Sequence, residues 1–206
     1  PNHSDERLAI DALRRKAILL DDPNLVAEYL RQRLQEARSD RQRVEIFKKM
    51  AESAGDTRRA VAVYGEAVAA FALSSDASTS LAANELACDK AILLQNLDAK
   101  RAVYQSVLER LSSSDVPQAV QLRSRAIVGL AKIAPDNAAR QARLQELQAM
   151  LLAHPHPKIS SDYFRILRLV LDDLDDQKEK STLCDQAIAV FSDSRGEDLG
   201  TAESIK

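Results

Sequence analysis

Two histidines set between prolines, His154-Pro155-His156-Pro157, are the first pair of side chains in this sequence that could bind a transition metal. Zinc-binding histidines on a helix stand three or four residues apart and converge with a third ligand, whereas alternate residues of an extended segment point to opposite sides. The two prolines also end one helix and delay the next. We therefore interpret this segment as a loop, and we predict no metal and no other cofactor.

Four aspartates within LDDLDDQKEK, residues 171–180, could bind calcium or magnesium: Asp172, Asp173, Asp175 and Asp176. A calcium loop alternates oxygen ligands and has a glycine at its sharp turn, but this run has no glycine and continues into Lys178 and Lys180. Acidic side chains at the start of a helix complement the helix dipole. We therefore favour a capped helix start over a bound cation.

Nucleophilic catalysis would need a serine or cysteine beside a base. Cys88 and Cys184 lie far in the sequence from the three histidines. Each lies on an apolar helix face, where a free cysteine is commonly a small buried residue. No glycine-rich phosphate-binding motif is present. The sequence therefore indicates that the chain is not an enzyme.

Composition points to helices, because five glycines and six prolines in 206 residues leave few turn formers for a protein of many short strands. The formal charge is −2, and the basic residues are interrupted by acidic ones, which disfavours a nucleic-acid partner. No apolar run reaches the length of about 20 residues that crosses a bilayer. Two isolated cysteines favour a cytoplasmic location, although a secreted chain whose signal has been removed would have the same composition.

The elements that would position any site are helices, because apolar residues recur at helical spacing between breakers. Asp22 before Pro23 predicts an N-cap followed by proline at the first helical position, and Asp176 with Glu179 predicts a capping box. Ten helices are expected, at 5–20, 24–38, 40–53, 57–73, 79–95, 98–111, 117–133, 137–153, 160–174 and 177–192.

Consecutive pairing of these helices gives five hairpins, each with an acidic turn. The turn residues are Asp22, Asp56, Asp98, Asp136 and Asp176, at spacings of 34, 42, 38 and 40, and the hairpin at Asp98 is out of register by about one residue. Such a period is typical of stacked helical hairpins, each of which buries its apolar face against its neighbours. We predict an all-α fold, a right-handed α-α superhelix (solenoid) of about five antiparallel hairpins in one domain over 1–192, with a polar tail over 193–206.

Apolar patterning also predicts where individual helices lie in the array. The helix at 117–133 is apolar nearly all round and should be sandwiched, and Gly65 indicates close packing against a neighbouring helix. The helix at 5–20 is broadly apolar, so either the chain is a piece of a longer array or this end docks onto a partner or onto itself. The helix at 177–192 resembles a terminal cap, with one apolar face of Leu183, Cys184, Ala187, Ile188 and Phe191.

The segment GDTRRAVAVYGEAVAAF, residues 55–71, resembles the second helix of a tetratricopeptide repeat. Five residues sit at the family spacing: Gly55 and Asp56 in the inter-helix turn, Ala60 at the helix crossing, the aromatic Tyr64, and Ala67 facing the neighbouring repeat. Small side chains let helix axes approach to about 8 Å, and an aromatic fills the groove between hairpins. The motif resemblance covers 41–71, and the architectural resemblance extends over 5–192.

The resemblance implies a concave groove, lined by the first helix of each hairpin, that holds a peptide or a partner helix. The positions in 41–53 that match the family's carboxylate clamp carry Glu45 and Lys49 in a different order, so that subtype is not supported. Four polar residues share one face at spacings of three and four, and they are the predicted partner-binding residues: Gln42, Glu45, Lys49 and Glu52. A plain solvated face is the alternative for each.

These expectations together indicate a scaffold or adaptor that binds another protein or a peptide through its helical-repeat surface. The complex can be part of a larger assembly. The alternative is a regulatory sensor module whose superhelix binds a peptide or a small effector. No membrane partner is expected.

Overall fold

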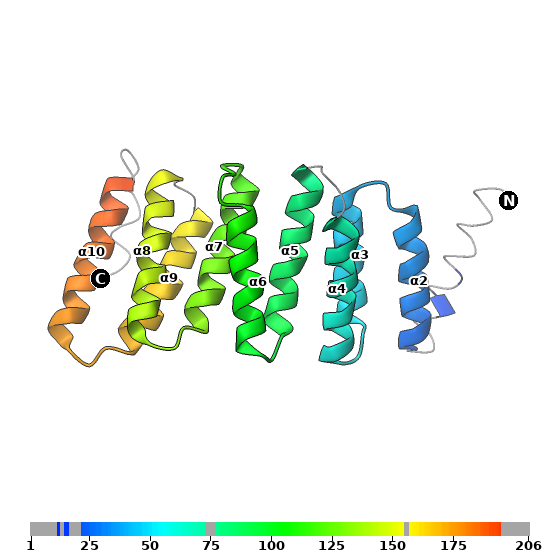
Figure 1. Cartoon of the computed structure of the whole chain (residues 1–206), viewed down its shortest axis with the longest axis horizontal. Coiled ribbons are helices and arrows are strands. Elements are labelled where there is room, and N and C mark those ends of the chain that lie inside the picture. Colours follow the sequence, from blue (N-terminus) through cyan, green and yellow to red (C-terminus); the bar gives the residue numbers. More distant parts are fainter. Residues whose placement is uncertain (1–11, 13–14, 17–21, 73–76, 155–156, 195–206) are drawn as a thin grey trace. The chain divides into compact units, whose positions relative to one another are not determined.

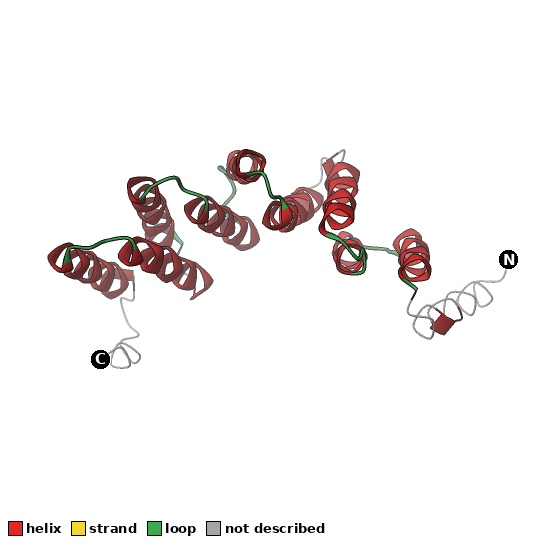
Figure 2. Ribbon diagram, turned by 90° about the horizontal axis from the view of Figure 1, so that it is seen from below, coloured by secondary structure: helices red, strands yellow, loops and turns green. Residues whose placement is uncertain are grey.

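The computed structural model describes residues 12, 15–16, 22–72, 77–154 and 157–194, and within these ranges all regular secondary structure is α-helical (Figures 1 and 2). The helix expected at 5–20 lies almost wholly outside the described residues. The other predicted helices are present within three residues of their predicted ends. They are α2 (Pro23–Glu36), α3 (Asp40–Glu52), α4 (Thr57–Ala72), α5 (Ala77–Leu93), α6 (Leu97–Arg110), α7 (Pro117–Lys132), α8 (Asn137–Ala153), α9 (Pro157–Asp172) and α10 (Gln177–Ser194).

Side-chain caps begin several of these helices, as the sequence predicts. The Asp22 carboxylate accepts from Asn24 N at 2.8 Å, with proline at the start of α2. Asp56 and Asp136 accept at 2.8 Å from Arg59 N and Ala139 N, and Asp176 accepts at 2.7 Å from Lys178 N and at 3.4 Å from Glu179 N. Each bond satisfies a backbone donor that has no partner within the helix.

The turn residue that begins α6 is Asn96, and the prediction of Asp98 is wrong. The Asn96 side chain accepts from Ala99 N at 2.8 Å, while Asp98 lies inside the first turn of the helix and pairs with Arg101 at 2.7 Å. An amide oxygen caps a helix as well as a carboxylate does. With Asn96 in this role, the capping residues 56, 96, 136 and 176 are each 40 residues apart.

The same interval of 40 residues separates the first residues of α5, α7 and α9, which are Ala77, Pro117 and Pro157. It also recurs in burial, because the residues 8, 11 and 15 positions after the cap are buried in three alternate helices or directly after them. These are Tyr64, Ala67 and Phe71 in α4, Tyr104, Val107 and Leu111 in and just after α6, and Leu144, Leu147 and Leu151 in α8. The chain is therefore an all-α helical repeat, as predicted.

The chain divides into two compact units, 1–103 and 104–206, and the prediction of one domain over 1–192 with a tail over 193–206 stays a prediction. In the first unit α3 packs against α2, α4 and α5, and α4 packs against α5. The rings of Phe47 and Phe71 meet edge-on with centroids 6.1 Å apart. Gly55, at φ +79°, makes the left-handed turn before α4 that glycine adopts without strain.

In the second unit α7 packs against both α8 and α9, which confirms that this apolar helix is sandwiched. Ser124 of α7 donates a buried hydrogen bond of 2.6 Å to Asp162 of α9. Helix α10 packs against α8 through buried Ala187 and Val190.

The predicted apolar face of α10 is partly wrong. Cys184 and Ile188 are exposed, Ile188 by 65%. The buried residues of this helix are Ala187 and Val190, with Leu183 packed against the core. Because successive residues of a helix are about 100° apart, Cys184 and Ile188 point away from the side that carries Leu183 and Ala187. The side chain of Phe191 lies outside the described residues. Cys88, by contrast, is buried as predicted.

Close helix packing occurs at Gly129 and not at Gly65, where it was expected. A Cβ at Gly65 would meet only the flexible tip of Lys90, at 3.5 Å. Gly129 instead lies against the ring of Tyr104 within the second unit. In the described part of the chain no helix is both long and apolar enough to cross a membrane.

Candidate functional site

The predicted partner-binding residues Gln42, Glu45, Lys49 and Glu52 are all exposed on α3. They lie on the opposite side of the helix from its buried residues, which are Val44, Phe47, Met50 and Ala51. The helical period of 3.6 residues produces this division, because each row recurs every three or four positions. We call the four exposed residues the α3 row; the structure brings them together on one face, and their role in binding stays a prediction.

Lys48 lies beside the α3 row and ties α3 to α5. Its Nζ forms an ion pair with Glu85 and lies 3.8 Å from Asp89 Oδ2. Partial burial lowers the pKa of Lys48, but the hydrogen bond that Lys48 donates to Glu85 and the charges of Glu85, Asp89 and Glu45 outweigh this effect. The pKa therefore lies above its ordinary value of 10.5. The ammonium group is therefore held in its charged form.

A second polar contact joins the same two helices, because the Thr79 hydroxyl donates to the carboxylate of Asp40. Neither contact was predicted from the sequence. The signal that could have found them is their separation in sequence of 37 and 39 residues, close to one repeat. Together they fix the helix that carries the α3 row against its neighbour, at two points along its length.

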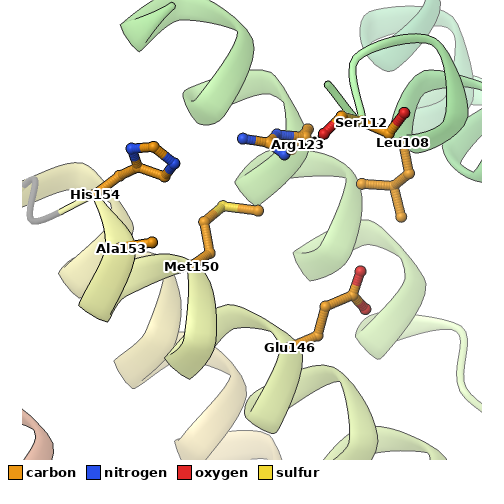
Figure 3. Close-up of a pocket in the computed structure, with 7 residues that line it drawn as sticks. All are labelled: Leu108, Ser112, Arg123, Glu146, Met150, Ala153 and His154. Carbon is orange, nitrogen blue, oxygen red and sulfur yellow. Dashed lines mark hydrogen bonds between the residues drawn. The ribbon is translucent and has the colours of Figure 1, made fainter. Parts of the chain in front are cut away.

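A pocket of about 310 Å³ lies in the second unit, between α6, α7 and α8 (Figure 3). Leu108, Met150 and Ala153 give it apolar walls, and Ser112, Arg123, Glu146 and His154 contribute polar groups. Arg123 extends from α7 and His154 from the end of α8, and their side chains approach each other above Met150 (Figure 3). His154 was a candidate ligand from the sequence, but the pocket itself was not predicted.

Arg123 is the most buried charged group of the pocket, with 14% of its side chain exposed. Its Nη1 donates to the Ser112 carbonyl at 3.0 Å, and its Nη2 lies 3.9 Å from Asp115 Oδ1. Its Nε is buried and has no hydrogen-bond partner. The same Asp115 oxygen lies 3.3 Å from His154 Nε2, so a single carboxylate faces both the guanidinium and the imidazole.

Two of the aspartates considered as metal ligands have structural contacts. Asp173 pairs with Arg140, and Asp176 caps α10, in line with the capped helix start that was favoured. His156 lies outside the described residues. Across the described ranges no group of three or more His, Cys, Asp or Glu side chains is arranged to hold a metal ion.

No protein-family model matches the chain, and no curated protein matches it. The tetratricopeptide resemblance therefore rests on the residues of 41–71, among which Ala60, Tyr64 and Ala67 are buried on one side of α4.

Proposed function

We propose that the chain is a scaffold or adaptor of tetratricopeptide-like type, which binds a peptide or a partner protein through the surface of its helical repeats. The observation that carries the proposal is the α3 row. Its four polar side chains share one exposed face of a helix whose opposite face supplies the core. The contacts within the first unit use the neighbouring Asp40 and Lys48 and leave the α3 row facing solvent.

The α3 row suits recognition by charge and by hydrogen bonding. Glu45 and Glu52 accept, Lys49 donates, and the Gln42 amide does both, although its oxygen also accepts from Arg38 N at 2.9 Å. Because α3 is anchored to α5 through Lys48 and Asp40, a partner would meet charges whose backbone positions are already set. Preorganisation of this kind lowers the entropy lost on binding. A cytoplasmic location belongs to the same proposal.

The experiment is a capture of partners from a native extract by the purified chain, at moderate and at high salt, followed by mass spectrometry. The test variant is Glu45→Lys with Lys49→Glu, which reverses two charges of the α3 row and keeps the net charge. The control variant, Arg168→Glu with Glu179→Lys, also reverses two charges and keeps the net charge, at exposed positions of α9 and α10. We expect a stoichiometric partner that the control retains and the test variant loses.

A partner retained equally by the two variants would refute the assignment to the α3 row. Circular dichroism of both variants is the check on folding, because surface substitutions of this kind usually change stability by about 0.5 kcal/mol or less.

The second candidate function is a regulatory sensor that binds a small effector, and the pocket of the second unit favours it. Its volume of about 310 Å³ lies at the lower end of the range of about 300–1,000 Å³ that is common for ligand pockets. An effector that binds the folded chain raises its midpoint of heat denaturation by mass action, whereas a scaffold responds to its macromolecular partner.

A further inference from the structure

The charge balance around Arg123 is incomplete. The guanidinium is largely removed from water, but its close acceptor is the neutral Ser112 carbonyl, and the nearest carboxylate is 3.9 Å away. That carboxylate belongs to Asp115, whose side chain is 77% exposed. A cation taken out of water is stabilised when an anion meets it at hydrogen-bond distance, and its donors are costly when they remain unpaired. Arg123 Nε, which has no partner, adds to this deficit.

The position of Asp115 marks where an anion fits. Its Oδ1 lies between Arg123 Nη2 and His154 Nε2, at 3.9 and 3.3 Å. The contact with Arg123 is long and open to solvent, and such pairs contribute about 0–1 kcal/mol. A ligand carboxylate held deeper in the pocket would meet the same two groups, and Asp115 can turn into water without loss of buried contacts.

The rest of the pocket limits what can be attached to that carboxylate. Leu108, Met150 and Ala153 supply apolar walls, which favour an aliphatic group. Glu146 lies at the far end from Arg123 (Figure 3). Its carboxylate already accepts a hydrogen bond of 2.7 Å from Arg143. Because Glu146 already takes up the charge of Arg143, a second negative charge on the ligand would meet no unpaired cation at this end of the pocket lining. The volume of about 310 Å³ suits a small molecule.

We propose that this pocket binds a small aliphatic monocarboxylate. The ligand carboxylate takes the place of Asp115 between Arg123 and His154, and its aliphatic group packs on Leu108 and Met150. Asp115 is then a built-in competitor that occupies the anion position when the ligand is absent. The inference specifies the ligand class of the sensor candidate; it does not involve the α3 row, so the two proposals fail separately.

The test is calorimetric titration of the full chain with 4-methylpentanoate and, as the matched probe without charge, with 4-methylpentanamide. The acid should bind at least about tenfold more tightly than the amide, because charge-assisted hydrogen bonds form with the carboxylate alone. Equal binding of the two probes, or no binding of either, would overturn the proposal. A peptide ending in leucine that bound where the free acid did not would overturn the assignment to a small molecule.

Variants separate the roles of the two charged residues. Arg123→Gln should weaken binding of 4-methylpentanoate by about thirtyfold, as expected for removal of one partner of a buried charge pair. Asp115→Asn should strengthen it by about threefold, because a weak surface pair no longer competes. Arg168→Gln, at an exposed position of α9, should leave it unchanged.

The Asp115 variant keeps the test decisive even if Arg123→Gln destabilises the second unit, since Asp115 is exposed and its loss leaves the core intact. Weaker binding by Asp115→Asn would show that Asp115 supports the ligand instead of competing with it, and the proposal would be wrong.

Discussion

The ring of Tyr104, on α6, lies directly over Gly129, on α7. A Cβ added at Gly129 would stand closer than 3.0 Å to three atoms of that ring. Tyr104 is buried, with 5% of its surface exposed, so the ring has little room to turn away. The pair lets the two helices approach at a point where any other residue would hold them apart.

Substitution of Gly129 by alanine should therefore destabilise the second unit, even though alanine is the better helix former. We expect a decrease of about 1–3 kcal/mol in the free energy of unfolding, the usual cost of overpacking a core. Urea denaturation followed by circular dichroism measures it.

Gly65→Ala is the matched control, because a Cβ there meets Lys90 Nζ at an ordinary 3.5 Å. This variant should gain up to about 1 kcal/mol from helix propensity. A gain at both glycines would contradict the close approach of Tyr104 to Gly129.

Replacement of the cap of α6 tests the 40-residue register. Asn96→Ala removes the acceptor of the 2.8 Å bond from Ala99 N and should cost about 1 kcal/mol. Asp98→Ala removes an exposed ion pair with Arg101 and should cost less, about 0.5 kcal/mol. Urea denaturation of the two variants ranks them, and a larger loss at Asp98 would restore the register expected from the sequence.

Tyr64→Ala tests the buried row of α4. Tyr64 is buried beside Ala60 and Ala67, so truncation of its ring should lower the free energy of unfolding by about 3 kcal/mol or more. Glu66→Ala, two residues on and exposed, should change it by about 0.5 kcal/mol or less. Similar stability of the two variants would disprove the packing of this helix.

Stability should fall in strongly alkaline solution. The pKa of Lys48 is raised above 10.5 by its acidic neighbours, against the effect of burial, and burial raises the pKa of Tyr163 above 10.0. Below these values both residues are protonated in the folded and the unfolded chain. Above them the unfolded chain loses protons first, so the free energy of unfolding decreases as pH rises through the folded-state values.

Denaturation midpoints measured between pH 9 and pH 12, a range of about three units around these pKa values, measure this loss of stability. Lys48→Met and Tyr163→Phe should each make the decline shallower than in the unsubstituted chain. The same decline in all three proteins would show that neither group contributes.

The helices could be predicted from the sequence because breakers, caps and apolar spacing are local signals. The register of the repeat was harder to predict, because aspartate and asparagine cap helices equally well and Asn96 and Asp98 are both near the start of α6. Only the hydrogen bond from Ala99 N to Asn96 identifies the cap. Cys184 was misassigned for a similar reason, because a small apolar residue fits either side of an amphipathic helix.

Of the two candidate sites, one could be predicted from the sequence and the other could not. The α3 row could be read from a single helix, because its four residues recur at helical spacing. The pocket could not, since Arg123 and His154 come from different helices and meet at Asp115, in the turn before α7. Convergence of residues 30 or more positions apart depends on packing, which no local pattern encodes.

A constant interval of 40 residues divides the second unit into blocks of equal length. Excision of residues 117–156 would join Val116 to Pro157, and this restores the Val-Pro junction at which α7 now starts. The caps and buried rows downstream would keep their order. Leu169 would then occupy the register position of Gly129 against Tyr104, so a change of length by a whole block also requires a small residue at position 169.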